Sequence, residues 1–179
     1  MTKMNDTYYE TLHEKVSKFG YTIMSVVSDE PRSPEHAAYC YTIGLSNYGF
    51  PEIMLADCCY DDVVELSDIL FDNASNGYEF NKSFVIKLAD TDGKFKAIEL
   101  LKGTKEELTE QAKHYFHLFR PEDKNYDLIY LGKADEFGLF PDEKMFVESK
   151  HIKKLFYKLS EHRNKEIANL VLPQPSAVQ

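Results

Sequence analysis

The sequence lacks the features that place a protein in or across a membrane. No apolar run approaches the roughly 20 residues that a membrane-spanning helix requires. The first 14 residues are polar and contain no apolar stretch of the kind found in signal peptides. We therefore expect a cytoplasmic protein that does not contact a membrane.

Cysteine is scarce as well. The chain has three, Cys40 and the adjacent Cys58 and Cys59, and this odd number shows none of the spacings of a disulfide framework. Such usage fits a reducing compartment. We interpret this as the cytoplasm of a bacterium, where either the bacterium or a phage produces the protein.

No strong enzyme signature is present. The sequence has no Gly-rich phosphate loop, no Gly-x-Ser-x-Gly elbow and no Cys-x-x-Cys pair, and it predicts no cofactor. Cys58 and Cys59 precede a helix whose N-terminus would favour a thiolate, but two small buried residues explain them more simply. Four residues at helical spacing could ligate a metal, yet they lie opposite an apolar stripe and resemble a solvated surface: Glu107, Glu110, His114 and His117.

The formal net charge is −9 at pH 7, which disfavours nucleic acid as a partner because such binding depends on basic surface. The charge is uneven, since residues 144–165 hold seven Lys or Arg and two Glu, a local +5. This basic segment could contact nucleic acid or lie against the acidic body of the same chain. We favour the second arrangement.

The length of 179 residues and the 43% apolar content suit one domain with its own core. We expect a single α+β domain over residues 1–172 and a disordered tail over 173–179. Strands and helices alternate without a regular βαβ order, which predicts a mainly antiparallel sheet packed against about four helices. The predicted strands are 21–28, 37–45, 51–57, 83–89, 95–101 and 126–132, and the predicted helices are 6–19, 61–75, 104–120 and 149–162.

One stretch combines an aromatic strand with a glycine near its end. A glycine inside a strand marks a bulge, or a close approach by backbone or ligand. If the next strand pairs with this one as a hairpin, an acidic residue comes to lie near a threonine and makes a small polar spot beside aromatic walls. The predicted binding residues are His36, Tyr39, Tyr41, Thr42, Gly44 and Glu52. The structural alternative is that Gly44 is a packing bulge and Glu52 pairs with a lysine.

The same stretch carries a family resemblance. Tyr-Thr-Ile-Gly-Leu at 41–45, followed by Phe-Pro-Glu-Ile at 50–53, resembles the hallmark of the bacterial domain-of-unknown-function 4262 family. The segment 134–141 is similar to that family's Asp-x-x-Gly-x-Phe-Pro stretch, although Asp142 replaces the usual aromatic residue. The resemblance covers about residues 20–145, and membership implies no particular activity.

A shorter likeness connects residues 39–46 to Suppressor-of-fused type domains, in which an aromatic strand also ends in Gly-Leu-Ser before a Gly-rich turn. This likeness implies a protein-binding module, as in bacterial relatives that resemble immunity proteins against toxins. We therefore expect a non-enzymatic binding module of immunity or inhibitor type, with a toxin or basic nuclease as partner. The alternative is an enzyme or small-ligand-binding protein that uses a pocket around Tyr41, Thr42 and Glu52.

Overall fold

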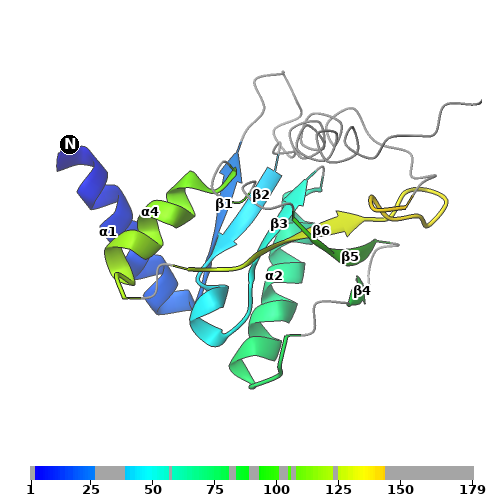
Figure 1. Cartoon of the computed structure of the whole chain (residues 1–179), viewed down its shortest axis with the longest axis horizontal. Coiled ribbons are helices and arrows are strands. Elements are labelled where there is room, and N and C mark those ends of the chain that lie inside the picture. The colour runs from blue at the N-terminus through cyan, green and yellow to red at the C-terminus, as the bar shows by residue number, and fades with distance from the viewer. Residues whose placement is uncertain are drawn as a thin grey trace, which may run out of the picture.

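The fold is α+β, with one sheet of six mostly antiparallel strands and helices on both of its faces (Figure 1). These features come from a computed structural model. The structure describes residues 3–26, 39–56, 58–80, 84–88, 93–100, 105, 108–122 and 125–143.

The sheet has the strand order β1-β2-β3-β6-β5-β4. Every neighbouring pair is antiparallel except β3 and β6, which run parallel with Ile53 opposite Ile129. The predicted antiparallel character is therefore confirmed, with one parallel pair at the centre. The strands are β1 Thr22–Val26, β2 Tyr39–Ile43, β3 Glu52–Ala56, β4 Val85–Lys87, β5 Lys94–Glu99 and β6 Leu128–Lys133.

Three α-helices are present in the described part of the chain: α1 Lys3–Phe19, α2 Tyr60–Ser75 and α4 Glu110–Phe119. A short 3-10 helix, η1 Leu45–Tyr48, connects β2 to β3. Apolar residues recur at steps of three and four in all three α-helices, so each has one face that can be buried. The predicted fourth helix at 149–162 and the predicted tail at 173–179 lie outside the described residues.

The helices form two layers around the sheet. One core lies between the sheet and α2, and includes Leu66 and Leu70 of the helix and Leu55 of β3. The other core lies between the sheet and the pair α1 and α4, and includes Met54 of β3 and Phe116 of α4. Because side chains alternate along a strand, Leu55 and Met54 serve opposite faces, and the central strand β3 is buried on both.

Aromatic residues dominate the contact between α1 and α4, which lie side by side in Figure 1. The ring of His13 stacks on Phe119 with centroids 4.1 Å apart, and its Nδ1 lies 3.2 Å from the Tyr115 hydroxyl. Offset aromatic pairs of this kind add about 0.5–1.5 kcal/mol beyond the area that they bury. They fix the position of α4, which in turn covers β2.

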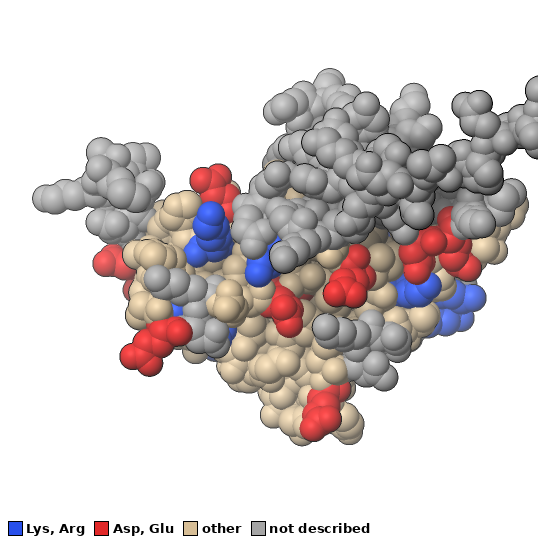
Figure 2. All heavy atoms as spheres, in the orientation of Figure 1, with Lys and Arg blue, Asp and Glu red and all other residues tan. Residues whose placement is uncertain are grey.

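Charge is spread over the surface rather than gathered at one place on the face shown in Figure 2, where acidic side chains are distributed across several elements. None of the described helices is both long and apolar enough to cross a membrane.

We predict that the protein loses stability above pH 10. Burial raises the pKa of Tyr115 to about 12, and it raises the pKa of the fully buried Tyr41 well above its usual range. The folded state thus keeps protons that the unfolded chain releases near pH 10, so the free energy of unfolding falls as pH rises through this window. Each such tyrosine removes up to about 1.4 kcal/mol at pH 11.

Urea unfolding at pH 7, 9, 10 and 11, followed by circular dichroism, measures this loss. Tyr41→Phe is the matched variant, because it removes one ionisable hydroxyl and should show a smaller decline between pH 9 and pH 11. An equal decline in both proteins would exclude Tyr41 as a contributor.

Candidate functional site

The carboxylate of Glu52 is fully buried at the start of β3 and is surrounded by hydrogen-bond donors. Oε1 accepts from the backbone N–H groups of Gly44 and Ser46, both at 3.0 Å, and from the Ser46 hydroxyl at 2.8 Å. Oε2 accepts from the Thr42 hydroxyl at 2.7 Å and from the Leu45 N–H at 3.3 Å. Both oxygens are therefore satisfied, which offsets the large free-energy penalty of burying a charge.

The donors come together because η1 begins at Leu45, whose own N–H donates to Glu52. The first N–H groups of a helical turn have no partner within the turn and point outward from its start. Successive N–H groups of this kind form a concave anion-binding arrangement. In this protein the anion is the chain's own Glu52, so the carboxylate holds η1 against β3.

Thr42 joins the two strands on which the arrangement depends. Its hydroxyl donates to Glu52 and accepts the N–H of Ile53 at 3.0 Å, and the residue is fully buried. It lies just beyond the paired part of β2 and β3, which ends at Tyr41 opposite Met54. The side chain thus continues the link between the strands where the backbone ladder stops.

Gly44 makes a close approach to the backbone that follows α1. Its φ of 127° lies in the region that only glycine adopts readily. A Cβ built at this position would lie 2.5 Å from the carbonyl oxygen of Gly20 and 2.8 Å from Cα of Tyr21. The expected close approach is therefore one by backbone, and η1 packs against the α1–β1 junction through it.

Tyr39 and Tyr41 donate their hydrogen bonds outside this polar cluster. Side chains alternate along β2, so both tyrosines lie on the face covered by α4 while Thr42 lies on the other. Tyr39 donates to the carbonyl of Leu108 at 3.0 Å, and Tyr41 donates to the side chain of Gln111. The structure therefore brings Thr42, Gly44 and Glu52 together and separates the two tyrosines from them. His36 lies outside the described residues.

Arg120, at the end of α4, forms the outer edge of the cluster. Its guanidinium donates to the Ser46 hydroxyl at 3.2 Å and to the Asn47 side chain at 3.4 Å. Tyr115, five residues earlier, lies near enough that the charge of Glu52 adds to burial in raising its pKa, while Arg120 opposes the shift. Tyr115 of α4 therefore interacts electrostatically with the charge of Glu52, which stays buried from solvent.

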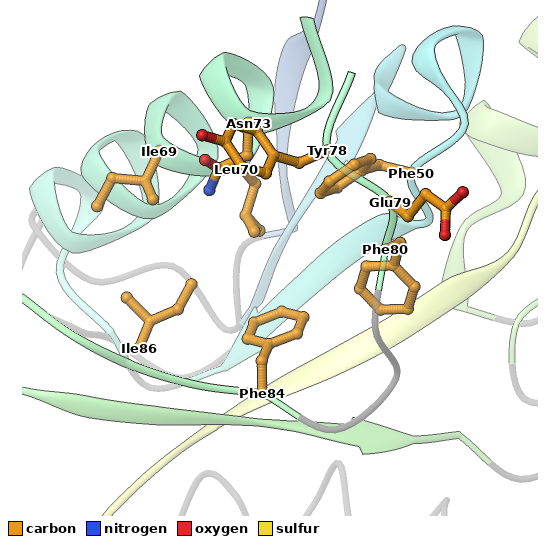
Figure 3. A pocket seen from close by; sticks show the side chains of 9 residues that line it. All are labelled: Phe50, Ile69, Leu70, Asn73, Tyr78, Glu79, Phe80, Phe84 and Ile86. Atoms are coloured by element: carbon orange, nitrogen blue, oxygen red, sulfur yellow. The ribbon is translucent and has the colours of Figure 1, made fainter. Parts of the chain in front are cut away.

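An open apolar groove of about 260 Å³ lies between α2 and β4 (Figure 3). Side chains of α2 form one wall, and Phe84 and Ile86 form the opposite wall (Figure 3). Phe50 and Phe80 meet edge to face at 5.7 Å, and Phe80 meets Phe84 in the same way at 5.5 Å. The lining residues are Phe50, Ile69, Leu70, Asn73, Tyr78, Glu79, Phe80, Phe84 and Ile86.

Sequence reasoning missed this groove. Its walls come from residues far apart in the sequence: Phe50 just before β3, the helix α2, and residues 78–80 and 84–86. A signal was nonetheless present, since Tyr78, Phe80, Phe84 and Ile86 recur at even spacings in a stretch that otherwise holds mainly polar residues. Alternation of this kind predicts a face that packs on something apolar, and here part of that face stays open.

The adjacent cysteines lie at the junction of β3 and α2. Cys59 is the N-cap of α2, and its sulfur accepts the N–H of Asp62 at 3.5 Å, while the buried Cys58 donates to the carbonyl of Ala56 at 3.2 Å. Lys133 of β6 forms an ion pair of 2.9 Å with the buried Asp62. Burial lowers the pKa of Lys133, but the hydrogen bond and charge of Asp62, with smaller effects of both thiols, raise it above its usual value.

The ion pair therefore neutralises a carboxylate inside the first turn of α2.

Within the described part of the chain, no group of three or more His, Cys, Asp or Glu side chains has the arrangement of a metal site. On the polar face of α4, His114 is half-buried and its Nδ1 lies 2.9 Å from the carbonyl oxygen of Glu110. Glu107 is outside the described residues.

No protein-family model matches the sequence, and no curated protein and no solved structure matches it either. The likeness to the domain-of-unknown-function 4262 family thus rests on the motifs at 41–53 and 134–141 and stays a prediction.

We predict that Glu52→Gln destabilises the fold. The substitution places an NH₂ group where a carboxylate oxygen now accepts from N–H donors, so at least one donor loses its partner. The expected loss is about 1–3 kcal/mol in the free energy of unfolding, measured by urea denaturation. The exposed Glu14→Gln is the control and should change stability by less than about 0.5 kcal/mol. Unchanged stability together with lost binding of a partner or ligand would instead assign Glu52 a functional role.

We also predict that Lys133→Met destabilises the protein, because it leaves the buried Asp62 carboxylate without its counter-ion. Lys133 is partly exposed, so water offsets some of the loss, and we expect about 1–3 kcal/mol at pH 7. Adding Asp62→Asn to the variant should recover part of this loss. Urea denaturation of the two single variants and the double variant measures the coupling, and additive effects would show that the pair contributes nothing to stability.

Proposed function

We propose that this chain is a non-enzymatic protein-binding module of immunity or inhibitor type, which receives an apolar side chain of its partner in the groove between α2 and β4. The observation that carries the proposal is the groove itself. Seven of its nine lining residues are hydrophobic, and Tyr78 at its rim is 66% exposed. Aromatic and aliphatic pockets that remain open to solvent are typical of interaction sites.

The size of the groove favours a side chain over a free metabolite. Pockets for small molecules usually measure about 300–1,000 Å³ and enclose most of the ligand. At about 260 Å³, this groove is smaller and is open to solvent. Such a shape accommodates one large apolar anchor while the rest of the partner remains outside, as in the central pocket of a protein–protein interface.

The walls of the groove are held by the core, so little ordering is needed on binding. Leu70 and Phe50 are buried members of the core beneath the groove, and Ile69, Phe80, Phe84 and Ile86 pack against the same core. A binding surface that is already in place loses less conformational entropy when a partner arrives. This supports a preformed docking site.

The polar cluster supports the alternative function less well. An enzyme or ligand site around Tyr41, Thr42 and Glu52 would need an accessible polar group, but all three side chains are fully buried. Each Glu52 oxygen already accepts hydrogen bonds within the chain. A ligand at Glu52 would have to displace η1, so the geometry favours a structural role for this cluster.

Site-specific photo-crosslinking in cells tests the proposal. The full chain carries a photoreactive phenylalanine analogue either at Tyr78, on the groove rim, or at Tyr8, an exposed tyrosine on α1. α1 covers the opposite face of the sheet, so the two positions report on different surfaces. We expect a covalent adduct to one partner protein from position 78 and not from position 8.

A substitution inside the groove tests whether the groove is the place where the crosslinked partner binds. Ile69→Gln puts a polar group on the α2 wall and should reduce the adduct at position 78 by at least about fivefold, the loss typical of an interface anchor. Adducts that are identical at both positions, or that persist in Ile69→Gln, would contradict docking in the groove. An added mass of a few hundred daltons in native mass spectrometry, lost in Ile69→Gln, would assign the groove to a small ligand.

A further inference from the structure

The groove lies beside an acidic helix, which constrains what can dock there. α2 contains five acidic residues and no basic one over its 16 residues. They are Asp61, Asp62, Glu65, Asp68 and Asp72. Of the five, only Asp62 is held in an ion pair by a residue that the structure describes, namely Lys133.

Two of these acids flank the groove. Glu65 lies one turn before Ile69, and Asp72 lies one turn after it, so both share the helix surface next to the α2 wall. Asp68 lies beside them and accepts a hydrogen bond of 2.5 Å from the Tyr21 hydroxyl. This arrangement forms an acidic ridge, defined here as Asp61, Glu65, Asp68 and Asp72.

The acidic ridge lowers the stability of α2 when no partner is bound. The C-terminal end of a helix carries partial negative charge and is stabilised by basic residues, whereas α2 has none in its last turn and places Asp72 near that end. Glu65 and Asp68, and likewise Asp68 and Asp72, are like charges three or four residues apart, a spacing that destabilises a helix by several tenths of a kcal/mol. A cationic group docked over the ridge would relieve both effects.

The opposite wall adds no positive charge to the groove. Ile86 of β4 packs against the core beneath the groove, so the next residue, Lys87, points to the other face of the sheet, as does Lys94 opposite it on β5. Among the nine lining residues the one charged side chain is the exposed Glu79. The described charges on the lining and on the α2 wall are therefore negative.

From this charge arrangement, and on the basis of the proposed function, we infer that the occupant is a protein segment with an apolar anchor flanked by Lys or Arg, whose cationic side chains lie over α2. The anchor fills the apolar groove, while the cations meet Glu65 and Asp72. The exposed ring of Tyr78 offers a face on which a guanidinium can stack.

A random peptide library displayed on phage, selected against the full chain, tests this inference. Recovered peptides are synthesised, and their Kd is measured against the wild type, Ile69→Gln, the double variant Glu65→Gln/Asp72→Asn, and a control double variant Glu10→Gln/Glu14→Gln on α1. The control removes the same charge from exposed positions on the opposite face of the sheet.

We expect peptides that combine an aromatic or aliphatic residue with Lys or Arg. Their Kd should rise at least about fivefold in Ile69→Gln and about five- to tenfold in the ridge variant at low salt. The effect of the ridge variant should shrink at about 0.5 M salt, where exposed charges are screened. The α1 control should bind as the wild type does.

The outcomes separate the two proposals. Peptides that depend on Ile69 but carry no excess of basic residues, or that bind the ridge variant unchanged, would overturn the inferred partner chemistry and leave docking in the groove intact. Peptides that bind Ile69→Gln as tightly as the wild type would overturn both.

Discussion

The rest of the structure depends on one buried charge, the carboxylate of Glu52, and on the ring of donors that neutralises it. An uncompensated carboxylate at this depth would prevent folding into this arrangement, so η1 has to begin where it does and Gly44 has to bring its N–H close. The same cluster joins β2, β3 and the end of α4 through Ser46 and Arg120. One polar centre thereby sets the relative positions of elements that belong to both cores.

Much of the sheet follows from the sequence, because strand signals are local. Alternation around Tyr41 and the β-branched residues of β1 predict strands, and turn residues predict the hairpin of β4 and β5. The parallel pairing of β3 with β6 could not be predicted, since it joins Ile53 to Ile129 across two helices and another hairpin. Such a choice depends on packing of the whole domain and not on any local pattern.

The candidate sites also combine features that the local sequence predicts with features that it does not predict. Residues near one another in sequence, such as Thr42, Gly44 and Glu52, were expected to meet, and they do. Their chemistry was harder to predict, because the partners of Glu52 are mainly backbone N–H groups, which every residue type except proline supplies. The groove was harder still to predict from the sequence, because it forms only when α2 packs beside Phe84 and Ile86.

The central parallel pair also has a consequence for synthesis of the protein. β1, β2 and β3 leave the ribosome early, but the neighbour of β3 is β6, which begins at Leu128. Until then the nascent sheet has an unpaired hydrophobic edge at β3, and closing so long a loop is entropically slow. An exposed edge of this kind invites pairing with other chains. The nascent protein is therefore expected to depend on protection of this edge, by a chaperone or by early packing of α2, until β6 has emerged from the ribosome.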